Sequence, residues 1–186
     1  SPSRLFLSER VSNVPGSAVL CSIEGSRPIL VEIQALVSGS AYGTGRRTVS
    51  GLDHNRLSLL LAVLEKHAGL SVVGEDVFIN VAGGLVVNEP AVDLGVVAAV
   101  ASSVRERGIH SGTVVFGEVG LGGEIRRVPQ VERRIREADR LGLKRCLVPK
   151  STPNFSQDNM GIEVVPVSTL AEALDACILR SNRKSV

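Results

Sequence analysis

The chain has 186 residues and a formal net charge of +2, and 44% of its residues are apolar, 22% charged and only 3% aromatic. This length suits one domain with a substantial hydrophobic core, and the apolar fraction excludes an intrinsically disordered chain. Because no stretch approaches the roughly 18 consecutive apolar residues of a membrane helix, a membrane-spanning protein is excluded as well.

The N-terminal part of the chain predicts an arm, a β-hairpin and a loop. Residues 1–15 have mixed polarity and are interpreted as a linker or arm before the domain, which is predicted to cover residues 16–179. Two apolar runs joined by Gly25-Ser26 predict the strands of a hairpin, Ser17–Glu24 and Pro28–Ser38. The glycine-rich segment 39–45 predicts a flexible tip before a short strand near Thr48–Ser50.

The spacing of apolar residues changes to a helical period after this strand. Four leucines at positions i, i+3, i+4 and i+7 predict one helix face, Leu57, Leu60, Leu61 and Leu64. This helix is expected to start near His54 with Asp53 as its N-cap and to end at Gly69. A buried strand over Asp76–Ala82 follows. The helix predicted over Ala91–Val104 is apolar on all sides and is therefore expected to be central in the domain.

Strands and helices alternate in the last third of the chain. The predicted strands are Thr113–Gly117, Arg145–Val148 and Glu163–Val167, and the predicted helices are Gln130–Leu141 and Leu170–Leu179. Residues 118–128 are expected to be extended and interrupted by glycines, and residues 180–186 form a basic tail. Strands that precede helices at first and alternate with them later predict an α+β fold with a mixed sheet and packed helices.

The cysteines and histidines predict neither disulfides nor a metal site. Three widely spaced cysteines lie in apolar runs and are interpreted as buried residues in a reducing, cytoplasmic compartment, Cys21, Cys146 and Cys177. The three histidines lack metal-ligand spacing. The first residues show no secretory signal, and the missing initiator Met is interpreted as the sign of a fragment or a processed chain.

Charge is distributed unevenly along the chain. Residues 71–100 hold four acidic residues and no Lys or Arg, whereas residues 121–150 hold nine basic residues against four acidic ones. Arginine outnumbers lysine 17 to 4, a bias that favours bidentate contacts with phosphate or carboxylate groups. Seven arginines are candidates for such contacts, Arg46, Arg47, Arg126, Arg127, Arg133, Arg136 and Arg140. A solvated helix face with internal ion pairs is an equally good interpretation of the basic segment.

Several common functional motifs are missing from the sequence. No Gly-Lys-Ser or Gly-Lys-Thr triplet of a nucleotide-binding loop occurs, and the glycine-rich segment 117–123 precedes Glu124, which would repel phosphate. No G-x-S-x-G nucleophile motif is present either. Of the five aromatic residues only Tyr42 is expected to be neither buried nor anchoring, so an aromatic platform for stacked bases is not predicted.

Several segments resemble known families in order and spacing. Asp76–Gly84 with Glu89–Ala99, and Gly117–Val128 with the residues up to Lys150, resemble the proteolytic domain of Lon proteases. From about Leu5 to Leu179 the chain resembles more closely the C-terminal region of the RadA (Sms) family of bacterial DNA-repair ATPases. Four segments carry this resemblance, Leu5–Arg10, Arg46–Asn55, Val77–Pro90 and Gly117–Gln130. It implies a ribosomal protein S5 domain 2-like fold, the fold of the Lon proteolytic domain.

The resemblance to Lon proteases implies that both catalytic residues have been lost. Lon proteases carry a serine at the start of the small-residue helix and a lysine after the glycine-rich hairpin. Here Asp93 stands in the serine's place and Glu132 where the lysine is expected, while Lys150 matches a different lysine of the family. The domain is therefore expected not to be an enzyme. Asp93 is interpreted as a charge favourable to the helix dipole and bonded to first-turn amides, with partner binding as the alternative.

The RadA resemblance implies a role in DNA repair and recombination. A non-proteolytic scaffold is expected, which assembles a hexameric ring, contacts single-stranded or branched DNA and acts with the recombinase RecA. The seven candidate arginines would contact DNA or the acidic 71–100 segment of a neighbouring subunit. ATP and Mg are expected only in an ATPase core N-terminal to residues 1–15. Two alternatives remain, a pseudo-protease groove that binds a partner peptide and, less favoured, a peptidase with a displaced Ser-Lys pair.

Overall fold

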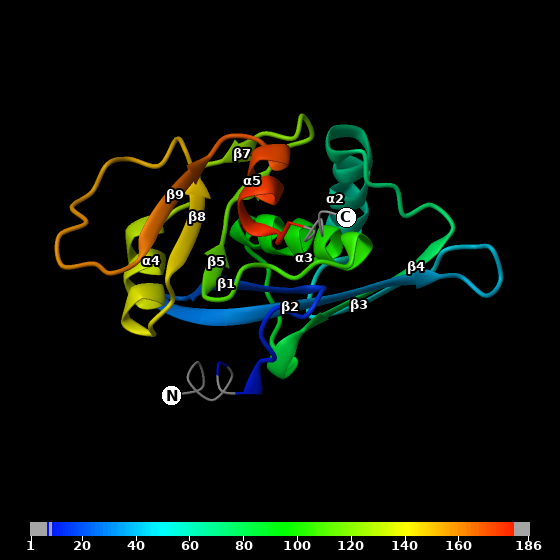
Figure 1. Cartoon of the computed structure of the whole chain (residues 1–186), viewed down its shortest axis with the longest axis horizontal. Helices are drawn as coiled ribbons and strands as arrows, with labels where there is room; N and C mark the ends of the chain where they lie inside the picture. The colour runs from blue at the N-terminus through cyan, green and yellow to red at the C-terminus, as the bar shows by residue number, and fades with distance from the viewer. Residues whose placement is uncertain (1–6, 8, 181–186) are drawn as a thin grey trace, which may run out of the picture.

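One seven-stranded mixed sheet forms the centre of an α+β fold, as predicted (Figure 1). The computed structural model describes residue 7 and residues 9–180. The strand order is β3-β4-β2-β1-β5-β8-β9, in which β2 is antiparallel to β1 and β4 and the other neighbours are parallel. The strands are β1 Ser17–Glu24, β2 Arg27–Gly39, β3 Arg47–Ser50, β4 Glu75–Val81, β5 Thr113–Val115, β8 Arg145–Pro149 and β9 Glu163–Val167. A separate hairpin pairs β6 Glu118–Val119 with β7 Ile125–Arg126.

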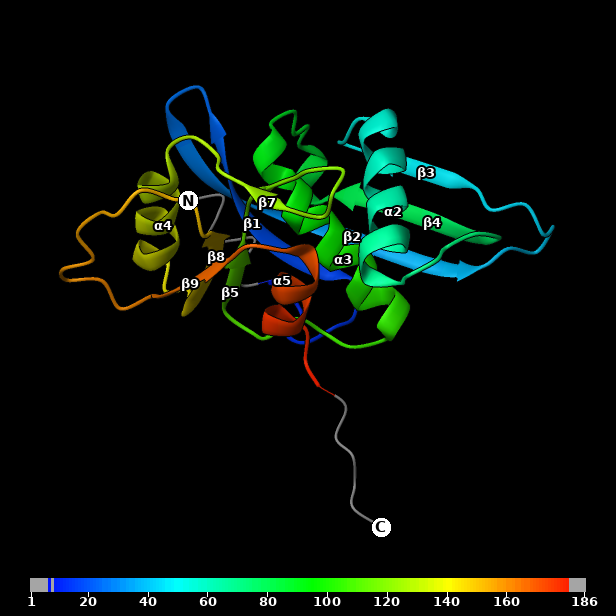
Figure 2. The same cartoon turned by 90° about the horizontal axis from the view of Figure 1, so that it is seen from above.

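Helices cover the two faces of this sheet unequally (Figure 2). The described α-helices are α2 His54–Ala68, α3 Asp93–Arg105, α4 Val131–Arg140 and α5 Leu170–Cys177. Buried residues of α2, α3 and α5 form one core with one face of β1, β2 and β4. Buried residues of α4 form a second core with the opposite face of β1 and with β5 and β8. No described helix has the length and apolar character needed to cross a membrane.

The cap and turn signals of the N-terminal half are confirmed. The side chain of Asp53 accepts a hydrogen bond from the backbone N–H of Arg56 at 2.9 Å, which fixes the start of α2. Gly69 ends this helix in the left-handed conformation, with φ of 65°. In the hairpin, Glu24 lies opposite Arg27, so its turn contains only the two residues predicted. These local signals therefore fix both ends of α2 and the turn of the first hairpin, as predicted.

The central helix starts two residues later than predicted. Residues Pro90–Val92 form a 3₁₀ turn, and α3 begins at Asp93. Gly117 explains the shift, because its N–H donates to the carbonyl of Ala91 at 3.0 Å and its carbonyl accepts from Leu94 at 3.1 Å. Within α3, a Cβ on Gly95 would lie 2.7 Å from a methyl carbon of Leu20, so glycine permits close packing on β1.

Part of the sheet lacks a covering helix in the described chain. On β2 and β4, Leu36 lies opposite Phe78, and their exposed fractions are 59% and 39%. Phe78 is expected to be buried or anchoring, and the first of these alternatives is wrong. Residues alternate between faces along β4, so Val77 and Ile79 enter the core while Phe78 points to the opposite face. Since α4 packs against β1, β5 and β8, it leaves the same face of the sheet uncovered at Leu36 and Phe78.

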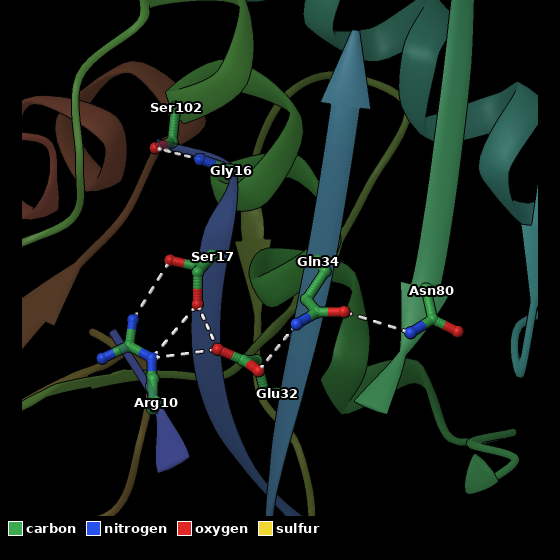
Figure 3. A network of polar contacts seen from close by, with 7 residues as sticks. All are labelled: Arg10, Gly16, Ser17, Glu32, Gln34, Asn80 and Ser102. Atoms are coloured by element: carbon green, nitrogen blue, oxygen red, sulfur yellow. Dashed lines mark hydrogen bonds and ion pairs between the residues drawn. The ribbon is translucent and has the colours of Figure 1, made fainter. Parts of the chain in front are cut away.

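The end of the predicted arm is attached to the sheet (Figure 3). Arg10 donates from Nε to the hydroxyl of Ser17 and to Glu32, both at 3.1 Å. Glu32 also accepts from Gln34, whose amide oxygen accepts from Asn80, each at 3.1 Å. The arm residues 1–6 and 8, and residues 181–186 of the predicted basic tail, lie outside the described residues.

Candidate functional site

Asp93, the residue at the expected nucleophile position, is fully buried in an ion pair. Its exposed fraction is 0%. Arg56 on α2 donates to its carboxylate through Nε, at 2.8 Å, and through Nη2. The backbone N–H of Val119 on β6 donates to the same carboxylate at 3.0 Å. The hydrogen bond with Asp93 raises the pKa of Arg56 above its usual value. One carboxylate thus connects α2, α3 and the β6–β7 hairpin.

The expectation that Asp93 bonds to first-turn amides is wrong. Val92 is the N-cap of α3, and Asp93 itself has helical backbone angles. A side chain reaches the free amides of a helix start most readily from an N-cap with extended backbone angles. Asp93 therefore turns to partners on other elements. Because none of its surface is exposed, a partner protein cannot contact it in this structure.

Glu132, the residue at the expected lysine position, lies on the exposed face of α4. Its carboxylate accepts from Arg136 at 2.9 and 2.7 Å, an ion pair one helical turn apart. None of the hydrogen bonds or ion pairs among the described residues joins it to Asp93. The described lysines, Lys66, Lys144 and Lys150, are exposed. No hydrogen bond in the described part of the chain joins a lysine amine to a hydroxyl.

A second buried ion pair, which the sequence reasoning missed, joins Arg134 to Glu89. Arg134 has an exposed fraction of 0%, and its guanidinium donates to both carboxylate oxygens of Glu89 and to the carbonyls of Cys21 and Pro129. The guanidinium carbon lies 5.8 Å from the ring centre of Phe116. Helical spacing could have indicated that Arg134 lies on the buried face of α4, since it follows the buried Val131 by three residues, but it does not identify Glu89 as the partner.

Arg134 and Glu89 bind backbone groups of β1 beyond the point where the neighbouring strand β5 ends. β5 is paired with β1 only at Val19, which lies opposite Val114. Beyond that point Arg134 donates to the carbonyl of Cys21, and Glu89 accepts from the N–H of Ile23 at 3.1 Å. The two charged side chains therefore replace the hydrogen bonds that a longer β5 would supply.

Removing the charge of Glu89 is expected to alter stability in a pH-dependent way. Burial opposes ionisation, but the hydrogen bond and charge of Arg134, with bonds from Ile23 and Ser22, hold the pKa of Glu89 below its usual 4.5. A carboxyl group with a lowered pKa stabilises the fold above its unfolded pKa, and this contribution is lost as pH falls through the folded value. Urea unfolding should therefore separate Glu89→Gln from wild type most at neutral pH. A gap that stays constant below about pH 4 would contradict this assignment.

The seven candidate arginines do not form one patch. Those on α4 and those beside the loop between β2 and β3 lie at opposite ends of the molecule's long axis (Figure 1). Three of them pair with a glutamate close in sequence, Arg126 with Glu124, Arg136 with Glu132 and Arg140 with Glu137. Part of the basic segment is thus a solvated surface with local ion pairs, the alternative considered from the sequence.

The other four candidates have different surroundings. Arg133 donates to the carbonyl of Ser26 at 2.8 Å, and Arg47 donates to the carbonyls of Glu75 and Val72. Arg46 is exposed, and its guanidinium carbon lies 5.6 Å from the ring centre of Tyr42. Arg127 is exposed beside β7. Within the described residues, neither Arg46 nor Arg127 forms an ion pair with a carboxylate.

The acidic segment 71–100 is engaged in part within the chain. Glu89 and Asp93 pair with Arg134 and Arg56, and Asp76 accepts from the backbone N–H of Arg46 at 2.8 Å. Two of its four negative charges are therefore neutralised by arginines of the same chain and are not free to meet those of a neighbouring subunit.

The cysteines are buried and free, as predicted. Burial raises the pKa of Cys21 and of Cys177 to about 12, and that of Cys146 well above its usual value. These thiols are protonated at neutral pH and unsuited to nucleophilic catalysis. Among the residues that the structure describes, no group of acidic, cysteine or histidine side chains could hold a metal ion.

Comparison with known proteins relates the chain to one set of relatives. No family model matches it. The protein named DNA repair protein RadA of Halalkalibacterium halodurans is 46% identical over 180 residues, which are 97% of this chain and 39% of the relative. Its namesakes in Bacillus subtilis and Listeria monocytogenes are 48% and 47% identical over 174 residues, 94% of this chain and 38% of each relative. The chain thus spans about two fifths of the length of these relatives.

Proposed function

We propose, from the premise that this chain belongs to the RadA family of DNA repair proteins, that it is a non-proteolytic Lon-like scaffold that contacts DNA. The observation that carries the proposal is that Arg46 and Arg127 are exposed and that neither their ion pairs nor their side-chain hydrogen bonds among the described residues engage a carboxylate. Arginines left unpaired by their own chain are available to bind phosphate groups.

The surroundings of the former catalytic positions support a non-proteolytic role. A Ser-Lys peptidase needs a hydroxyl nucleophile and an amine base within hydrogen-bond reach. Asp93 occupies the nucleophile position and is bound by Arg56 and by the N–H of Val119, while Glu132 faces solvent beside Arg136. The described lysines are exposed. The site has the organisation of a structural ion pair.

The charge distribution supports DNA contact over a subunit interface built from the acidic segment. Glu89 and Asp93 are bound to arginines of their own chain, so they offer little charge to another subunit. Phosphate contact by surface arginines gives sequence-independent binding that weakens with salt. The proposed ligand is single-stranded or branched DNA.

The resemblance extends the proposal to the longer protein. It implies that this domain helps to assemble a hexameric ring around an ATPase core, which would hold ATP and Mg. It also implies action with the recombinase RecA on branched recombination intermediates, in the cytoplasm. Residues 1–15 would be the connection to that core and residues 16–179 the scaffold.

Two matched double variants test the DNA contact. Arg46→Ala/Arg127→Ala removes two exposed arginines that have no carboxylate partner in the described part of the chain, whereas Arg136→Ala/Arg140→Ala removes two arginines bound to Glu132 and Glu137. Both lose two positive charges. Fluorescence anisotropy with labelled DNA at about 50 mM salt should show a loss of roughly tenfold or more for the first variant, from two lost phosphate contacts. The second should bind nearly as wild type does.

The same measurement distinguishes specific contact from general charge. Equal losses in the two variants would mean that net charge alone drives binding. Unchanged DNA affinity in both double variants would mean that none of these four arginines contacts DNA. Single-stranded and double-stranded DNA of equal length should be compared, since the relative affinities report which form the surface prefers.

A further inference from the structure

Tyr42 is the most exposed aromatic side chain of the described chain and its surroundings are unusual. Its exposed fraction is 79%, and it lies in the loop between β2 and β3. This loop extends beyond the end of the sheet in both views (Figure 1, Figure 2). A large aromatic ring gains nothing for the fold in such a place, because it buries little apolar area there.

The guanidinium of Arg46 lies over the ring of Tyr42, 5.6 Å from its centre. Cation–π contact accounts for this placement, and it holds beside an open aromatic surface a positive charge that forms no ion pair with any described carboxylate. With 79% of the residue exposed, the ring surface that Arg46 does not cover is open to solvent. An aromatic face next to a guanidinium matches a nucleotide, which offers a base to stack and a phosphate to bind.

Hydrogen bonds hold the backbone of the loop at both residues of this pair. The hydroxyl of Ser40 accepts from the N–H of Tyr42 at 3.4 Å and donates to the carbonyl of Thr44 at 3.1 Å. At the other end, the N–H of Arg46 donates to Asp76 at 2.8 Å, and its carbonyl accepts from Val77 at 2.8 Å. A loop whose backbone is already held in this way loses less conformational entropy when it binds a ligand.

One glycine fixes the path of the loop against β4. A Cβ on Gly45 would lie 2.4 Å from the carbonyl oxygen of Glu75, so only glycine allows this approach. Arg47 reinforces the junction by donating to the same carbonyl at 2.6 Å. The Tyr42–Arg46 pair is thus presented by an anchored loop.

We propose that Tyr42 and Arg46 bind one unpaired nucleotide of single-stranded DNA, with the base stacked on the tyrosine ring and the phosphate held by the guanidinium. The proposal rests on the proposed DNA contact and specifies the form of DNA recognised at this loop. A base within a duplex already stacks on its neighbours and does not offer a free face, so the site selects single strands. The stacking is sequence-tolerant, because every base has an aromatic face.

The chain offers a direct probe, because Tyr42 is its only tyrosine. Incorporation of 3-fluorotyrosine gives a single ¹⁹F NMR signal that reports on this ring. The ligands are an oligothymidylate and an abasic oligonucleotide of the same length, which has the same phosphates but no bases. The ¹⁹F signal is expected to shift with the oligothymidylate and to move much less with the abasic strand.

Two variants complete the test by affinity. Tyr42→Ala is expected to weaken oligothymidylate binding about tenfold while leaving the abasic strand unaffected, and Tyr42→Phe should retain the stacking. Equal effects of Tyr42→Ala on both strands, or equal ¹⁹F shifts, would overturn the base contact while the DNA-binding proposal stands. Absence of binding to either strand at low salt would overturn both proposals.

Discussion

Replacing Arg134 by methionine is expected to lower the free energy of unfolding by about 3 kcal/mol or more, because it leaves Glu89 without its buried cation. Methionine fills much of the volume but donates no hydrogen bond. The carbonyls of Cys21 and Pro129 would lose the donors that satisfy them at present. Since the chain contains no Trp, urea unfolding should be followed by far-ultraviolet circular dichroism.

Arg136→Met, also on α4, is the matched control for Arg134→Met. Its ion pair with Glu132 is exposed, and such pairs contribute about 0.3–0.5 kcal/mol. The double variant Glu89→Gln/Arg134→Met should regain part of the loss, because no unpaired charge remains. Similar destabilisation by Arg134→Met and Arg136→Met would show that the buried pair contributes no more to stability than an exposed one.

Replacing Arg56 by methionine is expected to destabilise the fold by a similar amount, about 3 kcal/mol. Asp93 has no exposed surface, so its carboxylate would remain buried with the N–H of Val119 as its main partner. Lys66→Met, an exposed substitution near the end of the same helix, should change the free energy of unfolding by less than about 0.5 kcal/mol.

The double variant Arg56→Met/Asp93→Leu separates structure from function. Replacing a buried ion pair by apolar residues of similar volume is often neutral, so most of the lost stability should return. Since the variant leaves Arg46 and Arg127 intact, its DNA affinity should match that of wild type. A double variant that is stable yet fails to bind DNA would give Asp93 a functional role beyond the fold.

The sequence was most informative where a local signal decides the structure. Asp53 and Gly69 mark the ends of α2 because capping depends on residues within one turn. The two-residue turn at Gly25-Ser26 sets the register of the first hairpin for the same reason. The start of α3 was placed wrongly because its backbone is bonded to Gly117, which is distant in sequence.

The candidate site was less predictable because its contacts join distant segments. Arg56 and Asp93 are 37 positions apart, and Glu89 and Arg134 are 45 apart, so no periodicity relates them. Counting charge over residues 121–150 could not distinguish arginines that are already paired from Arg127, which has no carboxylate partner among the described residues. Tyr42 was identified as exposed, but its contact with Arg46 depends on how the loop folds.

The salt dependence of DNA binding tests the central claim most directly, namely that surface arginines of a non-catalytic scaffold hold DNA phosphates. The logarithm of the association constant for a labelled oligothymidylate should be measured against the logarithm of salt concentration, for wild type and for Arg46→Ala/Arg127→Ala. We predict a linear decrease for both, with a slope about 1.4 shallower in the variant because two phosphate contacts are lost. Parallel lines, or wild-type binding that does not respond to salt, would contradict this account.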